Sequence, residues 1–501
     1  MATITTRLRK RLTSRKGQLT VFAGVAALTA LLVGAQVLSS QGATTGARKP
    51  PKHTPPVWKS AGGNASHSSD VVLQVALSQT KLVQGEDGNL YLNLSIVTPD
   101  GEGEQVGNTA TDFVVVLDRS PSMLAANKLP YAKAAVRELI GKLNATDRFA
   151  LIAFDRRAEV YSELIAVTPS SRQHLLRMVD NLDVGSATNI GAGLMRAKEL
   201  IAKSPSPRVK KILLLSDGET NTGITNPSAL ARMASDIAAR QIVLSTIGMG
   251  LGFNEALMAT LADQGMGNYS YLEHLSTLGH ILAKDLDDTR LIYAENSELR
   301  LQLQKGVKLH DAAGYPVATI NGSAEQIRIK TGQLLQGTRK NLILSLTSPT
   351  LSTGDYTLGK VTLEYKVDGT VKQRTLDPQY LAYTVVEASK KPEAKASIRP
   401  DVYRKTWRHN NLGRMRQQVY RWVKEGDKAK AQSAIDEYRR ELQDAEEESG
   451  LRLKSEAVEK DVTEMESKVE DAFSGAPAAQ AVKRNSLSKS MQYQGRQDQR
   501  K

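Results

Sequence analysis

Residues 113–123 read FVVVLDRSPSM. The first five are apolar and most of them favour extended backbone, so they predict a buried β-strand. This strand ends on Asp118, and Ser120 and Ser122 follow at alternate positions. A strand of an open α/β sheet delivers its last residues to the crevice where such folds bind ligands. We therefore expect one carboxylate and two hydroxyls at that edge of the sheet.

The sequence around this strand alternates between strand and helix patterns from about residue 112 to residue 290. Apolar runs occur at FVVVLD, FALIAF, KILLLSD and IVLSTIG, and helical stretches such as KLPYAKAAVRELIGKL separate several of them. Near-continuous apolar runs are typical of strands covered on both faces. The predicted fold class is α/β, with a doubly wound, mainly parallel sheet in which AEVYSELI forms an antiparallel edge strand.

Two further segments are expected to reach the same edge. GSATNIGAGL places Thr188 at the start of a helix, and LLLSDGETN ends a second strand on Asp217. The oxygen donors expected there are Asp118, Ser120, Ser122, Thr188 and Asp217. Such a set suits Mg²⁺, which prefers oxygen ligands in an octahedron; Mn²⁺ and Ca²⁺ are alternatives. Because the hydroxyls are neutral, the ion would keep positive charge and attract an external carboxylate.

These segments resemble the von Willebrand factor A family and its metal-ion-dependent adhesion site. DRSPSM, the threonine of GSATNIGAGL and LLLSDG match in order, and DRFALIAF and GNYSYLEHL resemble bacterial membrane-associated members. The resemblance spans roughly residues 109–290. It implies direct metal ligands at Asp118, Ser120, Ser122 and Thr188. It also implies that Asp217 acts directly or through water, and that an Asp or Glu of a protein partner completes the shell.

The sequence departs from the family pattern at two positions. Pro121 stands where glycine is frequent and stiffens the loop, while Arg119 is expected to put a cation beside the site. Both would tune which acidic partner fits. Taken singly, each serine or aspartate could instead cap a helix or pin a turn.

The amino-acid composition excludes several kinds of functional site. The 501 residues include no cysteine, which excludes disulfides, thiolate metal sites and a cysteine nucleophile. The net charge is +14, but the surplus lies in residues 1–16, 389–420 and 476–501, which leaves the middle of the chain mildly acidic. Only 5% of residues are aromatic. A basic face with interleaved aromatics is therefore missing, and no nucleic-acid partner is expected.

The N-terminal region predicts a membrane anchor. Residues 19–38 are uncharged and long enough for one crossing, and the basic segment 1–16 precedes them. The positive-inside rule then predicts a cytoplasmic tail (1–16), a transmembrane signal anchor (17–40) and a large extracytoplasmic region. The expected location is the cell membrane, with a single pass. A cleaved signal peptide, which would give a secreted protein, is the alternative.

Strand patterns flank the α/β domain on both sides. A flexible Pro-, Gly- and Ser-rich linker (41–69) leads to strands in residues 70–108, and further strands fill residues 293–388. We expect these two segments to join into one β-sandwich, into which the α/β domain (109–292) is inserted.

The C-terminal region is expected to be partly helical. A basic linker (389–411) precedes a helical hairpin or coiled coil (412–474), whose two apolar stripes flank the turn ESG at 448–450. The stripes form either the hairpin's own core or docking face, or an oligomer contact. The last segment, 475–501, is polar and basic, and disorder is expected there.

No enzyme chemistry accompanies the oxygen cluster. Phosphatases of the HAD type need a second acid two residues after the first, where this chain has Ser120, and the P-loop pattern is missing. The leading interpretation is therefore a non-enzymatic, metal-dependent binding or adhesion protein of the cell envelope. An alternative is an assembly or chaperone-like subunit of an AAA⁺ ATPase, with KTWRHNNLGRMRQQVYRW facing that partner. A metal-dependent hydrolase has the least support.

Overall fold

The computed structural model describes residues 59–61, 70–100, 110–204, 208–217, 220–272 and 275–500. The predicted cytoplasmic tail (1–16), the signal anchor (17–40) and most of the linker (41–69) lie outside these ranges. Within the described ranges, no helix combines the length and the apolar character that a membrane crossing requires.

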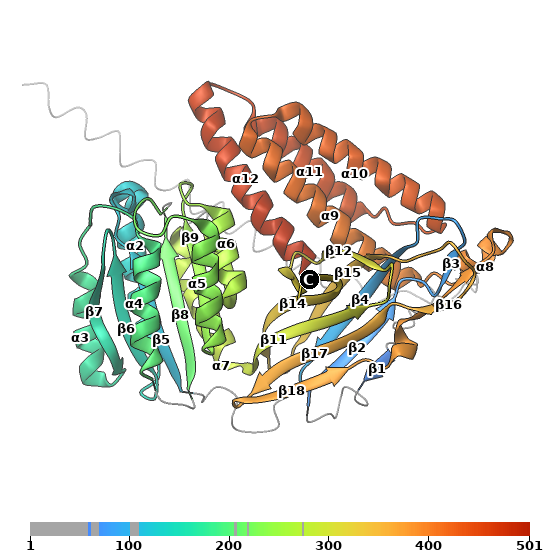
Figure 1. Ribbon diagram of the computed structural model, residues 1–501. Coiled ribbons are helices and arrows are strands. Elements are labelled where there is room, and N and C mark those ends of the chain that lie inside the picture. Colours follow the sequence, from blue (N-terminus) through green and yellow to red (C-terminus); the bar gives the residue numbers. More distant parts are fainter. Residues whose placement is uncertain are drawn as a thin grey trace, which may run out of the picture. The chain divides into compact units, whose positions relative to one another are not determined.

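The α/β domain is built on a six-stranded sheet with the order β10-β9-β8-β5-β6-β7 (Figure 1). Its strands are β5 (Thr111–Asp118), β6 (Arg148–Phe154), β7 (Ala158–Ala166), β8 (Val209–Ser216), β9 (Ile242–Met249) and β10 (Met266–Leu272). Neighbouring strands are parallel except for β6 and β7, which are antiparallel. The predicted mainly parallel sheet, with an antiparallel edge strand at AEVYSELI, is confirmed.

Helices cover both faces of this sheet because its central strand is apolar on both sides. Phe113, Val115 and Leu117 of β5 contribute to one hydrophobic core, while Val114 and Val116 contribute to the other. The first core is closed by α2 (Lys128–Lys142), α3 (Pro169–Asp180) and α7 (Leu278–Arg290). The second is closed by α4 (Ile190–Ala202), α5 (Pro227–Ala239) and α6 (Glu255–Gln264).

A β-sandwich is formed from strands on both sides of the α/β domain. One sheet has the order β1-β2-β4-β15-β12, with β1 (Lys59–Ala61), β2 (Val72–Leu77), β4 (Asn89–Val97), β15 (Arg339–Thr347) and β12 (Lys308–Ala312). A second has the order β13-β14-β11-β17-β18, with β13 (Val317–Ile320), β14 (Ser323–Leu335), β11 (Ile292–Leu303), β17 (Gly359–Val367) and β18 (Thr370–Thr375). A small third sheet contains β16 (Gly354–Thr357), β19 (Ala382–Val386) and β3 (Lys81–Val83). Leucines of β4, β11 and β15 share one core.

The α/β domain leaves and re-enters this sandwich at one turn. The carbonyl oxygen of Pro99 accepts a hydrogen bond from Gly337 N at 2.9 Å, and that of Leu291 accepts one from Gln336 N at 2.7 Å. Because 336 and 337 lie in the turn between β14 and β15, the two ends of the inserted domain flank the same turn. The inserted domain therefore does not interrupt the sandwich. Strand β4, which precedes the domain in the sequence, pairs directly with β15, which follows it.

The C-terminal region is helical over a longer stretch than the sequence suggested. Its main helices are α9 (Pro400–Glu425), α10 (Lys428–Ser449), α11 (Glu456–Ala472) and α12 (Pro477–Gln499), and a short helix α8 (Lys391–Ala396) precedes them. The two predicted apolar stripes lie inside one hydrophobic cluster shared by these helices. The expected basic linker at 389–411 is wrong, because α8 and the first turns of α9 occupy it.

The disorder expected for residues 475–501 is also wrong, since α12 spans most of this segment. Its sequence has few apolar residues, and Leu487 and Met491 are buried against the other helices. Much of its remaining contact surface is polar: Lys489 and Gln492 are buried as well. A helix of this composition is ordered by partners elsewhere in the chain, which its own pattern does not reveal.

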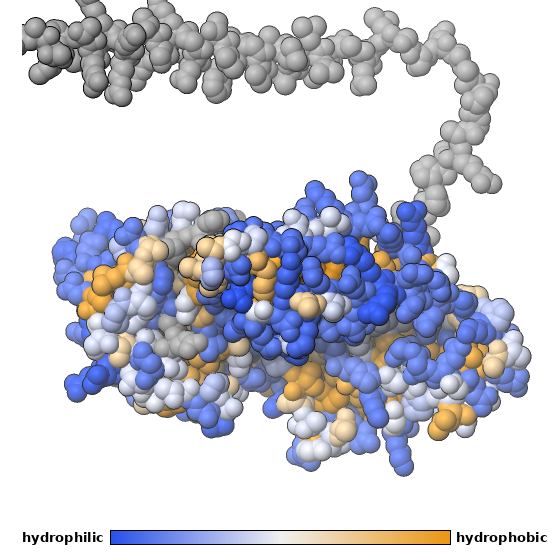
Figure 2. All heavy atoms as spheres, turned by 90° about the horizontal axis from the view of Figure 1, so that it is seen from above, coloured by the Kyte–Doolittle hydropathy of each residue, from blue (hydrophilic) through white to orange (hydrophobic). Residues whose placement is uncertain are grey.

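Figure 2 shows that one face of the molecule is largely hydrophilic, with hydrophobic residues gathered only in small patches. Large apolar side chains exposed within the described ranges include Leu124 and Ile224 of the α/β domain. Both lie on segments that follow the candidate ligands at the edge of the sheet.

Candidate metal-binding site

Asp118 is the last residue of β5 and is fully buried at the carboxyl edge of the sheet. Its carboxylate accepts hydrogen bonds from Ser120 N at 2.8 Å and from Ser216 Oγ at 2.6 Å. Burial raises the pKa of Asp118 to about 6; the hydrogen bonds from Ser216 and Ser120 oppose this rise, and the charge of Asp217 adds to it. A carboxylate desolvated to this extent favours a nearby positive charge.

The two serines connect Asp118 to Asp217. Ser120 Oγ lies 3.0 Å from Ser122 Oγ, and Ser122 Oγ donates to Asp217 Oδ1 at 2.8 Å. The first turn after Ser120 is a 3₁₀ helix, η1 (Pro121–Asn127), with Pro121 at its start. The fixed φ of proline suits that position and turns the chain back toward the sheet. Four of the five predicted residues therefore form one contiguous group of oxygen atoms.

Thr188 is brought to the same region through its backbone. It is buried and precedes Asn189, whose side chain caps the N-terminus of α4. Thr188 N donates to Asn221 Oδ1 at 3.0 Å, and its carbonyl oxygen accepts from Asn221 N at 3.0 Å. Thr188 is thus tied to the loop that follows Asp217. Within the described part of the chain, its side chain has no hydrogen bond to the other four residues.

Lys128, which the sequence analysis did not select, is part of this group. Its ammonium contacts Asp217 Oδ2 and lies 3.3 Å from the carbonyl oxygen of Ser122. The Lys128 side chain is about 10% exposed, and that of Asp217 is fully buried. A usable signal was present, because Lys128 falls on the apolar face of α2, four residues before the buried Ala132. A lysine on a buried helix face usually has an anionic partner.

Among the described residues, the Arg119 side chain makes no hydrogen bond or ion pair with the five candidate ligands. It donates to the hydroxyl of Tyr161 at 2.8 Å and pairs with Glu159 at 3.1 Å, both on the edge strand β7. The expectation that Arg119 places a cation beside the site is therefore wrong. The reason is local: the guanidinium contacts Tyr161 and Glu159 of β7 and lies 3.8 Å from Asp155, and none of these is a candidate ligand.

Asp155, another residue that the sequence analysis missed, holds the loop that carries Thr188. It accepts a hydrogen bond from Ser186 N at 3.1 Å, and its carbonyl oxygen accepts one from Asn189 N at 2.8 Å. Burial alone would raise the pKa of Asp155, but backbone hydrogen bonds from Arg157 and Ser186 and the charge of Arg119 lower it. Asp155 therefore stays ionised and acts as a fixed anchor for the loop.

The donor set is consistent with a hard divalent cation. It contains two carboxylates and two hydroxyls in contact, with a third hydroxyl-bearing residue on the adjoining loop. Within the described residues, no group of three or more His, Cys, Asp and Glu side chains is placed to hold a metal ion, so a site here would depend on the serine and threonine hydroxyls. Asp118 and Asp217 repel each other in a buried setting, and Lys128 is the protein's own positive charge beside Asp217. The residues fit a cation there, and they also show that the ammonium would compete with it.

The segment that carries the oxygen cluster also matches a known protein family. Residues 113–219 match the family model described as von Willebrand factor type A domain. The chain contains a von Willebrand factor type A (vWA) domain. The match begins in β5 and extends past Asp217, so it includes the strand ends and loops that carry the oxygen cluster.

Three similar proteins share low sequence identity with the chain. It is 28% identical to uncharacterized protein YfbK of Escherichia coli (strain K12) over 213 residues, 42% of this chain and 36% of YfbK. It is 28% identical to uncharacterized protein sll0103 of Synechocystis sp. over 266 residues, 51% of this chain and 61% of that protein. Inter-alpha-trypsin inhibitor heavy chain H1 of Mesocricetus auratus is 25% identical over 226 residues, 42% of this chain and 25% of that one. The chain therefore spans less than two thirds of these relatives.

A solved structure shares the wider architecture. The von Willebrand factor type A protein from Catenulispora acidiphila has a TM-score of 0.60, with 16% identity, and the match covers 85% of this chain and 94% of that one. At this identity the likeness concerns the fold. It extends well beyond the vWA domain, so a comparable arrangement of the flanking parts occurs in that protein.

Proposed function

We propose that the protein is a non-enzymatic binding protein whose vWA domain captures an acidic side chain of a protein partner through a divalent cation. The proposed ligands are Asp118, Ser120, Ser122, Thr188 and Asp217. Mg²⁺ is the preferred ion, and it would act as a positively charged bridge to a carboxylate of the partner. The match of residues 113–219 to the von Willebrand factor type A domain and the similarity to inter-alpha-trypsin inhibitor heavy chain H1 support a role in protein interaction.

The observation that carries this proposal is the unbroken contact from Ser120 through Ser122 to Asp217, beside buried Asp118. Neutral hydroxyls would leave a bound ion with residual positive charge. Exposed apolar side chains flank the cluster: Leu124 is 65% exposed and Ile224 is 37% exposed. Acidic recognition at the ion and apolar contact around it together suit a protein surface better than a small anion.

The location proposed for this activity is the cell envelope, with the N-terminal segment 17–40 as the anchor. The support comes from the sequence alone: an uncharged stretch behind a basic terminus. The alternative role, as a subunit of an AAA⁺ ATPase system, has less support. Trp407, Met415 and Val419 of its expected partner-facing segment are buried in the helical core.

The first test is metal binding by the full chain. Titration with Mn²⁺, followed by electron paramagnetic resonance and by competition with Mg²⁺, should show one site that is lost in Asp118→Ala. Asp180→Ala, which removes an exposed carboxylate of α3, is the matched control and should leave the site intact. Equal binding by wild type and Asp118→Ala would contradict the proposal. Partner binding that is abolished by EDTA and by Asp118→Ala would then complete it.

A further inference from the structure

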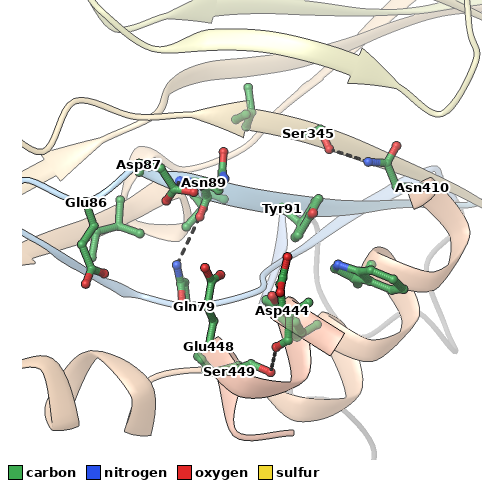
Figure 3. A pocket seen from close by; sticks show the side chains of 18 of the residues that line it. Gln79, Glu86, Asp87, Asn89, Tyr91, Ser345, Asn410, Asp444, Glu448 and Ser449 are labelled. Carbon is green, nitrogen blue, oxygen red and sulfur yellow. Dashed lines mark hydrogen bonds between the residues drawn. The ribbon is translucent and has the colours of Figure 1, made fainter. Parts of the chain in front are cut away.

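A groove of about 1170 Å³ lies between the β-sandwich and the C-terminal helices, away from the candidate metal site. It is bordered by the segment entering β4, by β12, and by helices α9 and α10. Figure 3 shows side chains that line it, among them Tyr91, Asn410 and Asp444. None of the five proposed metal ligands lines it. Its volume exceeds the roughly 300–1,000 Å³ that is typical of pockets for small ligands.

One wall of the groove is aromatic. Tyr91 of β4 and Tyr403 of α9 meet edge to face, with ring centroids 6.0 Å apart. Trp407, one turn further along α9, also lines the groove and packs on Tyr438. Such a wall offers apolar area for methylene groups or proline rings and π-faces for a cation.

The groove also has an acidic lining, and several of its basic residues form ion pairs with neighbouring carboxylates. Lys391 pairs with Glu86 at 2.5 Å, and Arg414 pairs with Glu441. Asp87, Asp444 and Glu448 line the same groove and have no ion pair within the described ranges. The side chains of Asp444 and Glu448 have no hydrogen bond there either, whereas the Asp87 carboxylate accepts two from Asn89. Figure 3 shows the side chains of Asp444 and Glu448 on the groove side of α10.

These three carboxylates act on one another. Asp444 and Glu448 are one helical turn apart, a spacing at which like charges destabilise a helix. Burial raises the pKa of Glu448, and the charges of Asp87, Asp444 and Glu86 raise it further. Lys391 opposes this rise, but negative charge is in excess where the carboxylates converge, close to the aromatic residues Tyr91 and Tyr403.

We propose that this groove binds an extended basic segment of a partner protein, with two Lys or Arg side chains directed at Asp87, Asp444 and Glu448. The aromatic wall would hold the aliphatic stems of those side chains. Charge complementarity identifies the occupant as cationic, and the size of the groove favours a peptide over a single small cation. The groove is separate from the candidate metal site. The protein would therefore have one surface that binds acidic side chains and another that binds basic ones.

The test uses the full chain in EDTA, so that a failure of the metal site cannot influence the result. Fluorescence anisotropy would follow a labelled decapeptide of alternating Lys and Pro, with a Glu–Pro decapeptide as the peptide control. The double variant Asp444→Asn/Glu448→Gln should weaken binding about twofold to fivefold for each charge removed. Added salt should weaken wild-type binding, because the carboxylates are solvent-exposed.

The matched control is Asp436→Asn/Glu437→Gln, which removes two exposed carboxylates of the same helix outside the groove. It should bind the Lys–Pro peptide like wild type, and circular dichroism should be the same for both double variants. No binding of the peptide, or equal affinity in all three proteins, would overturn the proposal. So would binding of spermidine at these carboxylates without binding of the peptide, since the occupant would then be a small polyamine.

Discussion

Lys489 of α12 and Glu255, the first residue of α6, form a buried ion pair with Nζ 2.7 Å from Oε2. Lys489 also donates to the carbonyl oxygen of Phe253 at 2.6 Å, and Lys424 of α9 pairs with the other carboxylate oxygen of Glu255 at 2.5 Å. Burial alone would raise the pKa of Glu255, but hydrogen bonds from Lys424 and Lys489 lower it to about 2. The C-terminal helices are therefore attached to the vWA domain by charges that stay ionised.

This attachment reaches the loop behind the candidate metal site. Asn485 of α12 donates to the carbonyl oxygen of Leu251 at 2.7 Å. In the same loop, a Cβ atom placed on Gly250 would lie 2.9 Å from Cε of Lys128, the residue that pairs with Asp217. A single short loop thus contacts both α12 and the lysine of the oxygen cluster.

The variant Glu255→Gln should loosen α12. Removing one partner of a buried ion pair costs about 3–5 kcal/mol, because the remaining charge is left desolvated. Hydrogen exchange should show faster exchange in α12 and in residues 250–254, while the sandwich core changes little. Glu459→Gln, which breaks the surface pair with Lys454, is the control and should change protection by less than about 1 kcal/mol. Unchanged protection in α12 would show that the pair does not hold the helix.

The variant Lys128→Met should strengthen binding of Mg²⁺ or Mn²⁺ by about tenfold, because a unit positive charge no longer opposes the ion a few ångströms away. Without metal, the same variant should be less stable, since buried Asp217 loses its cation. Mn²⁺ titration and thermal unfolding would measure the two effects. Lys133→Met, which alters a partly exposed lysine of α2 outside the cluster, is the control. Weaker metal binding by Lys128→Met would show that the lysine supports the site instead of competing with it.

Lys340 of β15 should make stability depend on pH. Desolvation, with a smaller effect from the charge of Arg500, lowers the pKa of Lys340 to about 7. Its Nζ donates to the carbonyl oxygens of Thr331 and Gln333 at 2.7 and 2.6 Å, bonds that a neutral amine can also make. An unfolded lysine keeps its proton up to about pH 10.4, so between about pH 7 and pH 10 the unfolded state binds more protons.

Stability should therefore rise with pH in this window, by at most about 1.4 kcal/mol per pH unit. Urea unfolding of wild type and Lys340→Met at several pH values between 6.5 and 9.5 would isolate the effect. The rise should disappear in Lys340→Met and persist in Lys360→Met, which alters an exposed lysine of β17. Parallel pH profiles for wild type and Lys340→Met would mean that Lys340 titrates at the same pH in both states.

The vWA domain should fold when it is separated from the sandwich. Its two hydrophobic cores consist almost entirely of residues between 113 and 286, and its ends meet at one turn of the host. A protein of residues 110–291 should unfold cooperatively and give a dispersed NMR spectrum. A molten state, with helical circular dichroism but no side-chain dispersion, would show that α12 and the sandwich are required for its packing.

Some elements were predictable from local pattern. The apolar run 113–117 must be a strand buried on both faces, and the turn at Asp368 and Gly369 joins β17 to β18 through two residues with positive φ. The apolar stripes that include Ile435 and Val462 are buried as their spacing predicts. In each case the local sequence is enough to predict the element, either from the spacing of apolar residues or from residue types that favour a turn.

Other features depended on partners far away in the sequence. Lys128 and Asp217 are 89 residues apart. Asp155 holds a loop 31 residues away, and α12 makes polar contacts with α6 and α9. Charged and polar side chains have no period that identifies their partner, so these contacts were not predictable.

The local sequence was thus sufficient for the class of the α/β domain, for the position of Asp118 and the serines at a strand end, and for the helical stripes. These features were predictable because buried apolar residues recur at regular spacing along a helix or strand, and this spacing is visible within a short segment. Tertiary contact alone decided that an ammonium neutralises Asp217, that Arg119 turns away, and that the basic C-terminal segment is an ordered helix. Those outcomes depend on which charges meet in a desolvated setting, and only the packed chain brings them together.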